Sequence, residues 1–371
     1  MKVFKLPTQI HKFSTFKDFA AEFNVGKGDL VLTQQFIYDP FMKDLQLEAD
    51  FVMQEKYGAG EPSDEMIDQI LDEVNKGSYK RIIAIGGGTV IDIAKLLIFK
   101  DGKKALPMFD KAIDFVKDKE LIVVPTTCGT GSEVTNISIA ELKARHTKMG
   151  LAIDELYPDY AVLIPELIKG LPFKFFVFSS IDALIHAVES YVSPSANELT
   201  QMISVKAIEM ILNGYRQIVK NGENYRMELL EDFALASNYA GIAFGNTGVG
   251  AVHALSYPLG GTYHVPHGEA NYQFFTTVFK VYHRKHPNGK IKKLNQIMAQ
   301  MLNTQEDLVY DALEQLLDQL LSRKPLREYG MKEEEIEGFT DSVLEKQQRL
   351  LANNYVPLER VEIVKIYRSL Y

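Results

Sequence analysis

The sequence predicts an α/β domain built on a parallel sheet, followed by an all-helical domain. In the first part of the chain, short apolar runs alternate with amphipathic stretches of helical period, which is typical of parallel strands covered by helices on both faces. Beyond about residue 170 the helical period dominates and strand-like alternation almost disappears. We therefore predict an α/β domain over residues 1–170 and a helical domain over residues 171–371.

The strands of the first domain are expected where apolar residues form short uninterrupted runs, because strands buried on both faces do not alternate. Three such runs are DLVLT at 29–33, RIIAIGGG at 81–88 and KELIVVP at 119–125. Between the first two, SDEMIDQILDEVNKG at 63–77 combines apolar residues at helical spacing with an acidic first turn. Ser63 precedes that turn and is suited to cap the helix.

The helical domain is expected to follow the segment GLPFKFFVFSS at 170–180. Long stretches such as TQMISVKAIEMILNGYRQIV and EDLVYDALEQLLDQLLS repeat apolar residues at helical spacing. The stretch SSIDALIHAVESYVS at 179–193 predicts a further helix, which we expect to begin just after Ser179 and Ser180.

Composition and charge narrow the class of protein. The chain has a formal net charge of −8 and no extended basic tract, so nucleic-acid binding has little electrostatic support. Its N-terminus lacks the apolar core of a signal peptide, and no uncharged apolar run approaches the roughly 18 residues of a membrane span. Cys128 is the single cysteine, which excludes disulfides within the chain and a thiolate-rich metal site. These features predict a cytoplasmic protein with no nucleic-acid or membrane partner.

A glycine-rich turn follows the second predicted strand. RIIAIGGGTVIDIAK places Gly87 and Gly88 directly before a helix that we expect to open at Thr89. Glycines at such a turn let the backbone approach a phosphate, and the helix N-terminus adds amide donors. The spacing is not the GxGxxG fingerprint, so a simple tight turn is an equally good interpretation of this motif taken alone.

A second loop of this kind follows the third predicted strand. PTTCGTGSEVTN at 125–136 interleaves small hydroxylated residues with glycines, which suits a pyrophosphate or a nicotinamide ribose. By itself it also fits an ordinary polar connection. Because both loops follow parallel strands, they are expected at the sheet edge where ligands of open α/β folds bind. Together the two loops predict a nucleotide or dinucleotide site.

Four side chains of the helical domain predict a metal site. Asp182 and His186 are four positions apart on a predicted helix and therefore share a face, an arrangement that a simple helical charge pair also shows. The stretch VHALSYPLGGTYHVPHGEAN adds His253 and His267. One carboxylate and three imidazoles suit Fe(II) or Zn(II) and leave a coordination position for a substrate oxygen.

The motifs resemble the iron-containing alcohol dehydrogenase family, whose architecture is similar to that of dehydroquinate synthase. They are GGGTVIDIAK, PTTCGTGSEVTN, IDALIHAVESYVS and HALSYPLGGTYHVPHGEAN, and the correspondence extends over nearly the whole chain. The resemblance implies a Rossmann-like α/β domain that binds NAD(P) and a helical domain that holds one divalent metal. It also implies hydride transfer between the nicotinamide and a substrate whose oxygen the metal polarises.

Carried over by motif, the resemblance implies particular site residues. The metal ligands would be Asp182, His186, His253 and His267. The cofactor contacts would be Gly87, Gly88, Thr89, Asp92, Thr126, Thr127, Thr130 and Lys148. Iron(II) is the preferred metal, with zinc(II) as the alternative, and relatives imply a homo-oligomer, either a dimer or a larger assembly.

Two departures from the family pattern affect the expected chemistry. Where many members carry a proton-relaying histidine, this chain has Tyr257. The group that relays the proton is therefore not assigned, and the candidates are Tyr257, His264, solvent and a ribose hydroxyl. Gln34 falls about where an acidic residue often selects against the 2′-phosphate of NADP. NAD is therefore the expected cofactor, with NADP not excluded. Cys128 is interpreted as a small packing residue within its loop.

The resemblance also implies a substrate. The stretches VPTTCGTGSEVTN, SYPLGGTYHVPHGEAN and LLSRKPLREYGMKEEEIE carry a closer match within the family, which implies interconversion of 4-hydroxybutyrate and succinate semialdehyde. Its carboxylate needs a cation or several donors, for which Lys143, Arg145, His146, His264 and basic residues of the helical domain are candidates.

Besides a non-catalytic binding protein, which would not explain an open metal site facing a nucleotide loop, two other functions remain open. One is the same chemistry on a diol or a simple primary alcohol. The other is an NAD-using lyase similar to dehydroquinate synthase, which must bind a phosphorylated sugar acid through several basic residues near its metal. The VHALSYPLGGTYHVPHGEAN stretch contains neither Lys nor Arg, which counts against the lyase.

Overall fold

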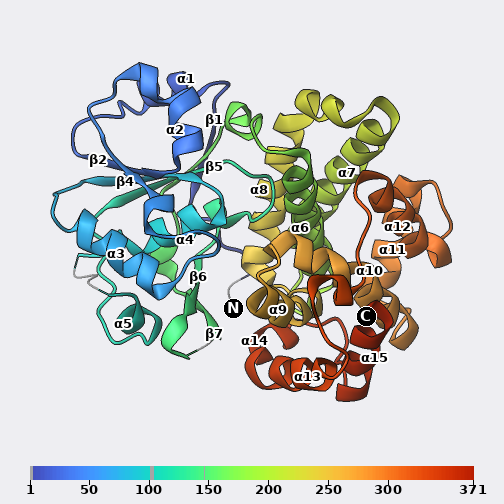
Figure 1. Ribbon diagram of the computed structural model, residues 1–371. Coiled ribbons are helices and arrows are strands. Elements are labelled where there is room, and N and C mark those ends of the chain that lie inside the picture. The colour runs from blue at the N-terminus through green and yellow to red at the C-terminus, as the bar shows by residue number, and fades with distance from the viewer. Residues whose placement is uncertain (1–2, 101–103, 146) are drawn as a thin grey trace. The chain divides into compact units, whose positions relative to one another are not determined.

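The structure is a computed structural model that describes residues 3–100, 104–145 and 147–371 (Figure 1). The chain divides into two compact units, of which one spans Leu6–Leu171. The other spans Pro172–Tyr371 together with a short N-terminal segment that ends at Lys5. The backbone N–H of Lys5 donates to Asn246 Oδ1 at 2.7 Å, and Asn246 Nδ2 donates back to the Lys5 carbonyl at 3.0 Å. These two hydrogen bonds tie the segment to the helical unit.

The first unit is built on one six-stranded parallel sheet, which confirms the predicted fold class. The strand order is β1-β8-β5-β4-β2-β3. The bounds are β1 Gln9–Lys12, β2 Asp29–Thr33, β3 Asp50–Met53, β4 Arg81–Gly86, β5 Glu120–Pro125 and β8 Tyr160–Leu163. The three predicted strands are β2, β4 and β5, and they lie next to one another in the sheet.

The central strands are buried on both faces because each face packs against a different hydrophobic core. Ile82 and Ala84 of β4 belong to one core, whereas Ile83 and Ile85 belong to the other. The first core is shared with α3 Asp64–Val74, α4 Gly88–Leu96, α5 Ala105–Phe109 and the antiparallel hairpin of β6 Ile137–Leu142 and β7 Thr147–Ala152. The second is shared with α1 Phe16–Glu22 and α2 Gln35–Phe41. The unit is therefore a three-layer α/β structure, as Figure 1 shows.

Helix α3 begins where the sequence predicts, because Ser63 caps it and its Oγ accepts a hydrogen bond from the Met66 backbone N–H at 3.3 Å. The helix after the first glycine loop begins at Gly88 with Gly87 as its N-cap, one position before the predicted start at Thr89. Gly86 is required in this turn, because a Cβ on it would lie 2.5 Å from Val90 Cγ2. The strand therefore passes directly into the helix.

The second unit is helical throughout its regular structure. Its long helices are α6 Phe173–Val192, α7 Glu198–Asn221, α8 Leu230–Thr247, α9 Ala251–Tyr263, α10 His267–Lys285, α11 Lys290–Leu302, α12 Val309–Leu320, α13 Glu335–Lys346 and α15 Arg360–Leu370, with the short α14 Gln348–Leu351. Helix α6 packs against α7, α8 and α10 and is buried along nearly its whole length. Among the described residues it is the one helix long and apolar enough to span a membrane, but 89% of its most apolar window is buried inside the protein. This burial is typical of a core helix.

The predicted start of the α6 helix at Ser179 and Ser180 is wrong. The helix begins earlier, at Phe173, directly after Pro172. Inside it, Ser179 Oγ donates to the Phe176 carbonyl and Ser180 Oγ to the Val177 carbonyl, each at 3.1 Å. A serine pair resembles a cap in sequence, but here both hydroxyls bond the preceding turn instead.

One lysine of the α/β unit is completely buried. Lys95, in the last turn of α4, has an exposed fraction of 0%. Its Nζ donates to Ser132 Oγ at 2.9 Å, to Thr135 Oγ1 at 3.2 Å and to the Ile137 carbonyl at 2.7 Å. Burial lowers the pKa of Lys95 to about 8, although the charges of Asp92 and Glu133 act in the opposite direction.

We predict that Lys95→Met changes the pH dependence of stability. The pKa of Lys95 is about 8 in the folded chain against an ordinary value of 10.5, so between these values the unfolded chain holds the extra proton. Raising the pH through this window therefore stabilises the folded protein, and the methionine variant lacks this contribution. In denaturant titrations, the unfolding free energy of the unsubstituted protein minus that of the variant should rise by roughly 1–3 kcal/mol as the pH increases across the window. A constant difference would contradict the buried lysine.

Candidate metal centre and cofactor loops

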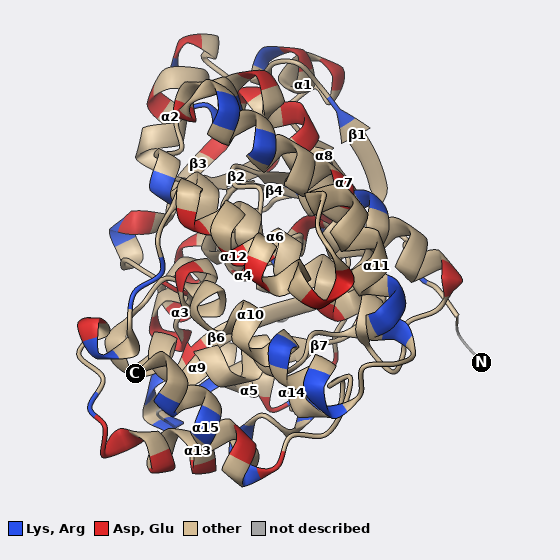
Figure 2. Ribbon diagram, turned by 90° about the vertical axis from the view of Figure 1, so that its right-hand side faces the viewer, with Lys and Arg blue, Asp and Glu red and all other residues tan. Residues whose placement is uncertain are grey.

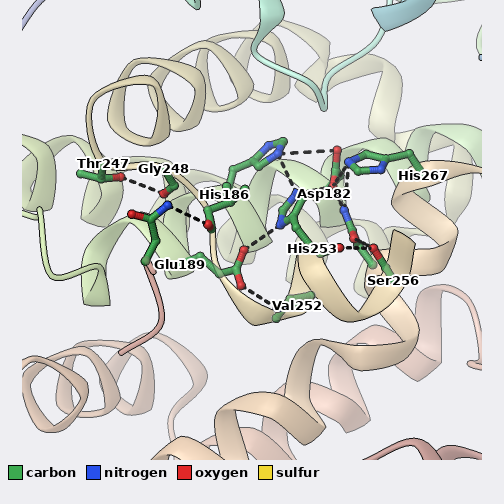
Figure 3. Close-up of polar contacts among 12 residues, drawn as sticks. Asp182, His186, Glu189, Thr247, Gly248, Val252, His253, Ser256 and His267 are labelled. Atoms are coloured by element: carbon green, nitrogen blue, oxygen red, sulfur yellow. Dashed lines mark hydrogen bonds and ion pairs between the residues drawn. The ribbon is translucent and has the colours of Figure 1, made fainter. Parts of the chain in front are cut away.

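The four predicted metal ligands come together in the helical unit, as Figure 3 shows. Asp182 and His186 lie on α6, His253 lies in the first turn of α9, and His267 is the first residue of α10. One ligand atom from each residue lies within 4.8 Å of all the others. Asp182, His186 and His253 are buried, and His267 is half-buried. Three helices thus direct four donors to one point.

The separations between these atoms suit a single metal ion. His253 Nε2 lies 3.0 Å from His186 Nε2 and 3.6 Å from Asp182 Oδ1. His267 Nε2 lies 3.8 Å from the same carboxylate oxygen. With bonds of about 2.1 Å, the ligand atoms of a tetrahedral site lie roughly 3.4 Å apart. One ion therefore fits between the four side chains without rearrangement of the helices.

The electrostatics of the cluster favour an ionised carboxylate. Burial would by itself raise the pKa of Asp182, but the charges of His186, His267 and His253 and a hydrogen bond from Asn271 outweigh it and hold that pKa below its usual value. Burial likewise opposes protonation of His253, yet Glu189 and Asp182 together raise its pKa. The site therefore attracts positive charge, whether proton or cation.

Close backbone contact at Gly268 brings His267 to α6. A Cβ on Gly268 would lie 2.4 Å from the Phe178 carbonyl oxygen and 3.4 Å from Asp182 Cβ. Phe178 is one turn before Asp182 on α6. Only a glycine allows the first turn of α10 to pack this closely against α6, and this contact places His267 beside Asp182.

A buried carboxylate that the sequence analysis missed orients His253. Glu189 of α6 is 3% exposed, its Oε2 lies 2.7 Å from His253 Nδ1, and its Oε1 accepts the Val252 backbone N–H at 2.8 Å. Because a carboxylate only accepts hydrogen bonds, this contact assigns the ring proton to Nδ1. The lone pair of Nε2 then faces the cluster. Glu189 follows His186 by three positions, a spacing that could have suggested it from sequence.

A second missed residue holds the carboxylate of the cluster. Asn271 Nδ2 donates to Asp182 Oδ1 at 2.7 Å, and Asn271 Oδ1 accepts a hydrogen bond from Ser256 Oγ. Ser256 Oγ is also 2.9 Å from the His253 carbonyl. Asn271 lies four positions after His267 on α10 and thus on the same helix face. The ligands are therefore held by a connected set of buried hydrogen bonds.

The two predicted cofactor loops lie side by side in the α/β unit. The Thr126 backbone N–H donates to the Gly86 carbonyl at 3.0 Å. A Cβ on Gly87 would lie 3.4 Å from Thr127 Cγ2, and one on Gly88 would lie 3.1 Å from Thr130 Cγ2. The structure therefore brings together the predicted glycines and threonines at the carboxyl ends of β4 and β5. Their contact with a cofactor stays a prediction.

Three other predicted cofactor contacts are engaged within the unit. Asp92 directs both carboxylate oxygens inward, to Ser132 Oγ at 2.8 Å and to the Ile139 backbone N–H at 3.0 Å. Thr89 Oγ1 donates to the Gly60 carbonyl at 3.0 Å, and Lys148 forms an ion pair with Glu61. Thr89, Asp92 and Lys148 remain predicted cofactor contacts, but in this structure they bind parts of their own unit.

Cys128 and Gln34 belong to the same unit. Cys128 is completely buried, which agrees with its interpretation as a packing residue.

Gln34 occupies the position before the first residue of α2, and its side chain donates through Nε2 to Gln54 Oε1 at 3.1 Å. Gln34 is therefore held at the end of β2, at the position where the family pattern places a residue that selects the cofactor.

The candidates for proton relay lie in the helical unit, whereas Lys143 and Arg145, two candidates for carboxylate binding, belong to the α/β unit. Tyr257 lies one turn after His253 on α9, and its ring centroid is 6.2 Å from that of His267. His264 is the exposed residue that ends α9. Lys143 Nζ and Arg145 Nη1 each form ion pairs, with Glu65 at 2.6 Å and with Asp110 at 2.7 Å respectively, and His146 lies outside the described residues. Within the helical unit, Tyr257 is the candidate in ring contact with a predicted metal ligand.

Comparison with known families identifies the class of protein. The model of the family described as iron-containing alcohol dehydrogenase matches residues 8–165, and that of the C-terminal domain of the Fe-containing alcohol dehydrogenase family matches residues 176–371. The chain belongs to the iron-containing alcohol dehydrogenase family, which confirms the predicted family. It is therefore an oxidoreductase of this family.

Individual relatives match over most or all of the chain. It is 63% identical over 371 residues to the 4-hydroxybutyrate dehydrogenase of Clostridium kluyveri, covering 100% of both chains. It is 34% identical to long-chain-alcohol dehydrogenase 1 of Geobacillus thermodenitrificans, covering 80% of this chain and 76% of that one. The crystal structure of a 1,3-propanediol oxidoreductase has the same fold, with a TM-score of 0.86, 24% identity and 100% coverage of both chains.

Substitution of Gly268 should disturb the metal cluster. Gly268→Ala places a methyl group against the Phe178 carbonyl, so α10 must move away from α6 and carry His267 with it. We expect the affinity for Fe(II) to fall at least about tenfold, as measured by anaerobic titration. Gly261→Ala is the matched control, because its Cβ would meet open space on α9. Equal Fe(II) affinities of the two variants would contradict the close approach.

Substitution of Glu189 should weaken the metal site without removing a ligand. Glu189 accepts hydrogen bonds on both oxygens, whereas glutamine has a single acceptor oxygen, so Glu189→Gln leaves either Val252 or His253 facing an amide group. Loss of such a supporting contact typically lowers metal affinity about 10- to 100-fold. Competition with a chelating dye measures this affinity, and an unchanged value would show that Glu189 does not orient His253.

Proposed function

We propose that this protein is an NAD-dependent, metal-dependent dehydrogenase that interconverts 4-hydroxybutyrate and succinate semialdehyde. The observation that carries the proposal is the convergence of Asp182, His186, His253 and His267 in a chain 63% identical over its full length to an enzyme named for that substrate. The paired glycine and threonine loops at the carboxyl ends of β4 and β5 support the cofactor part of the proposal.

The residues present fit one divalent transition metal. The donors are one carboxylate oxygen and three imidazole nitrogens, which suit Fe(II) and, as the alternative, Zn(II). Their buried hydrogen-bond partners Glu189 and Asn271 orient two of them, as expected for a metal site rather than for a chance group of polar side chains. We therefore assign the four side chains as ligands of one ion, with Fe(II) preferred.

When bound, the metal supplies a Lewis acid for the substrate oxygen and NAD supplies the hydride acceptor. The protein side chains prepare this chemistry. Asp182 contributes the negative charge that partly neutralises a cation in a buried setting. Glu189 keeps the Nε2 lone pair of His253 directed at the cluster. We assign the binding of the cofactor phosphates and ribose to the amide groups at the start of α4 and the hydroxyls of the neighbouring loop.

Tyr257 is the favoured group for moving the substrate proton. Its ring lies 6.2 Å from that of His267, whereas His264 is exposed at the end of the same helix. A tyrosine hydroxyl both donates and accepts hydrogen bonds, so it is able to pass a proton between the substrate oxygen and solvent. We assign this role to Tyr257.

The preference for NAD over NADP rests on the end of β2. Gln34 stands there in place of an acidic residue, and its amide is hydrogen-bonded to Gln54. A 2′-phosphate requires arginine nearby, and the sequence around Gln34 contains no cluster of arginines. NAD is therefore the proposed cofactor, with weak discrimination against NADP.

Two alternative functions are a dehydrogenase of simple alcohols and a lyase. The 34% identity to a long-chain-alcohol dehydrogenase favours a simple alcohol as the second candidate substrate. A lyase similar to dehydroquinate synthase is disfavoured, because the segment that carries His253 and His267 has neither Lys nor Arg to bind a sugar phosphate.

We also propose that the protein acts in the cytoplasm on a small molecule, without nucleic-acid or membrane partners, as a homo-oligomer. The net charge of −8 supports the absence of nucleic acid. Figure 2 shows basic residues interspersed with acidic ones along the helices, which agrees with this proposal. Light scattering of the purified protein measures its oligomeric state.

The function is tested by NADH oxidation with succinate semialdehyde, using protein loaded anaerobically with Fe(II). We expect rapid turnover, and loss of roughly a thousandfold or more in His267→Ala, because a Lewis acid contributes several kcal/mol. His283→Ala is the control, since His283 lies near the far end of the same helix α10. Activity that survives in His267→Ala would refute the metal assignment. Faster turnover of butyraldehyde than of succinate semialdehyde would favour the simple-alcohol alternative.

A further inference from the structure

The buried lysine of α4 is bonded entirely to one segment of the chain. Two of its three acceptors, on Ser132 and Thr135, lie in the second half of the second cofactor loop, and the third, on Ile137, follows directly after it. Lys95 is 0% exposed, so it cannot touch a ligand itself. Any part it plays in binding must therefore pass through the residues that it holds.

Asp92 binds the same segment from the preceding turn of α4. It lies three positions before Lys95 and shares its helix face. Its Oδ1 accepts the Ser132 hydroxyl at 2.8 Å and its Oδ2 accepts the Ile139 backbone N–H at 3.0 Å. The Ser138 hydroxyl donates to the Asp92 backbone carbonyl at 2.8 Å. One face of α4 thus fixes the chain on the far side of the loop.

Ser132 connects this arrangement to the loop that is expected to meet the cofactor. Its backbone N–H donates to Thr130 Oγ1 at 3.3 Å, while its hydroxyl lies between Asp92 and Lys95. Thr130 in turn packs against Gly88, where a Cβ would lie 3.1 Å from Thr130 Cγ2. A continuous set of contacts therefore runs from Lys95 through Ser132 and Thr130 to the N-terminus of α4.

Burying a charged side chain in an apolar core is energetically unfavourable. Burying an ammonium group costs several kcal/mol even when it is paired, and well-packed apolar residues are often at least as stabilising. What lysine provides here, and an apolar residue does not, is three directed hydrogen bonds to one loop. The arrangement therefore serves the position of the loop rather than the stability of the core.

We propose that Asp92, Lys95 and Ser132 form a latch that holds the PTTCGTG loop in its cofactor-binding position. Asp92 and Lys95 are then positioning residues for NAD, acting through Ser132 and Thr130. This inference rests on the proposed function, because it takes NAD as the ligand of the loop. It also gives Asp92 a supporting role in addition to the direct contact predicted from the family.

The test is Lys95→Met in the full-length protein, with NADH as the probe. Fluorescence titration should show the Kd for NADH raised at least tenfold, and the KM for NADH should rise in parallel. The kcat at saturating NADH should stay within threefold, and the Fe(II) affinity within twofold, because the metal ligands lie in the other unit. Lys80→Met, at an exposed lysine just before β4, should leave all four quantities unchanged.

Hydrogen exchange provides a second measurement that does not depend on NADH. Backbone amides of residues 126–139 should exchange at least tenfold faster in Lys95→Met than in the unsubstituted protein. If Lys95→Met fails to fold, the double variant Asp92→Asn/Lys95→Met removes both charges and leaves neither unpaired. It should fold and show the same loss of amide protection, which is the deciding measurement for this variant because Asp92 is itself a predicted cofactor contact.

The possible results separate the latch from the proposed function. A folded variant with NADH affinity within twofold of the unsubstituted protein, even at a reduced melting temperature, would overturn the latch and leave a purely structural lysine. Failure of the unsubstituted protein to bind NADH would overturn the proposed function instead. In that case the exchange rates still decide whether Lys95 holds the loop, since unchanged rates would overturn the latch as well.

Discussion

The candidate metal centre depends on how closely the first turn of α10 approaches α6. Two of the four donors are supplied by α6 alone, because Asp182 and His186 are one turn apart. The other two come from separate helices and reach the same point only through tertiary packing. At Gly268 the α10 backbone lies against the Phe178 carbonyl, a contact that no side chain permits. This contact sets the position of His267, and the hydrogen bond from Asn271, on the same helix, holds the Asp182 carboxylate.

The helical unit places strongly polar groups in an apolar interior, and it does so by pairing each of them. Asp182, Glu189 and Asn271 are each no more than 3% exposed, and each is hydrogen-bonded or faces an imidazole. Burying these groups costs less free energy when they are paired than when they are left without partners. Since the partners are held by different helices, they also fix the direction of each donor. Stability and ligand geometry therefore come from the same hydrogen bonds.

In the α/β unit, the two cofactor loops must be held in fixed positions relative to each other. Adjacent parallel strands end at the same edge of the sheet, so β4 and β5 bring the glycines of one loop against the threonines of the other. The sheet determines where the loops begin, but a loop rich in glycine and small residues has little to determine its own path. Side chains of α4, which starts in the first loop, bind the second half of the second loop and the residues just after it. The hydrogen bonds from α4 therefore help to fix the distance between the two loops.

By itself, the sequence determined the fold class, the three central strands, the cap of α3 and the identity of the four clustered residues. Each of these depends on local patterns, namely uninterrupted apolar runs, helical spacing, or the residue types of short motifs, two of which supply the four clustered residues. Only the tertiary structure decided the roles of Glu189, Asn271 and Lys95, because their partners are distant in the chain; His253 lies 64 positions from Glu189. It also decided where α6 begins, since the serine pair that resembles a cap is satisfied inside the helix. Local patterns predict elements, but the partner of a buried polar group is chosen by packing.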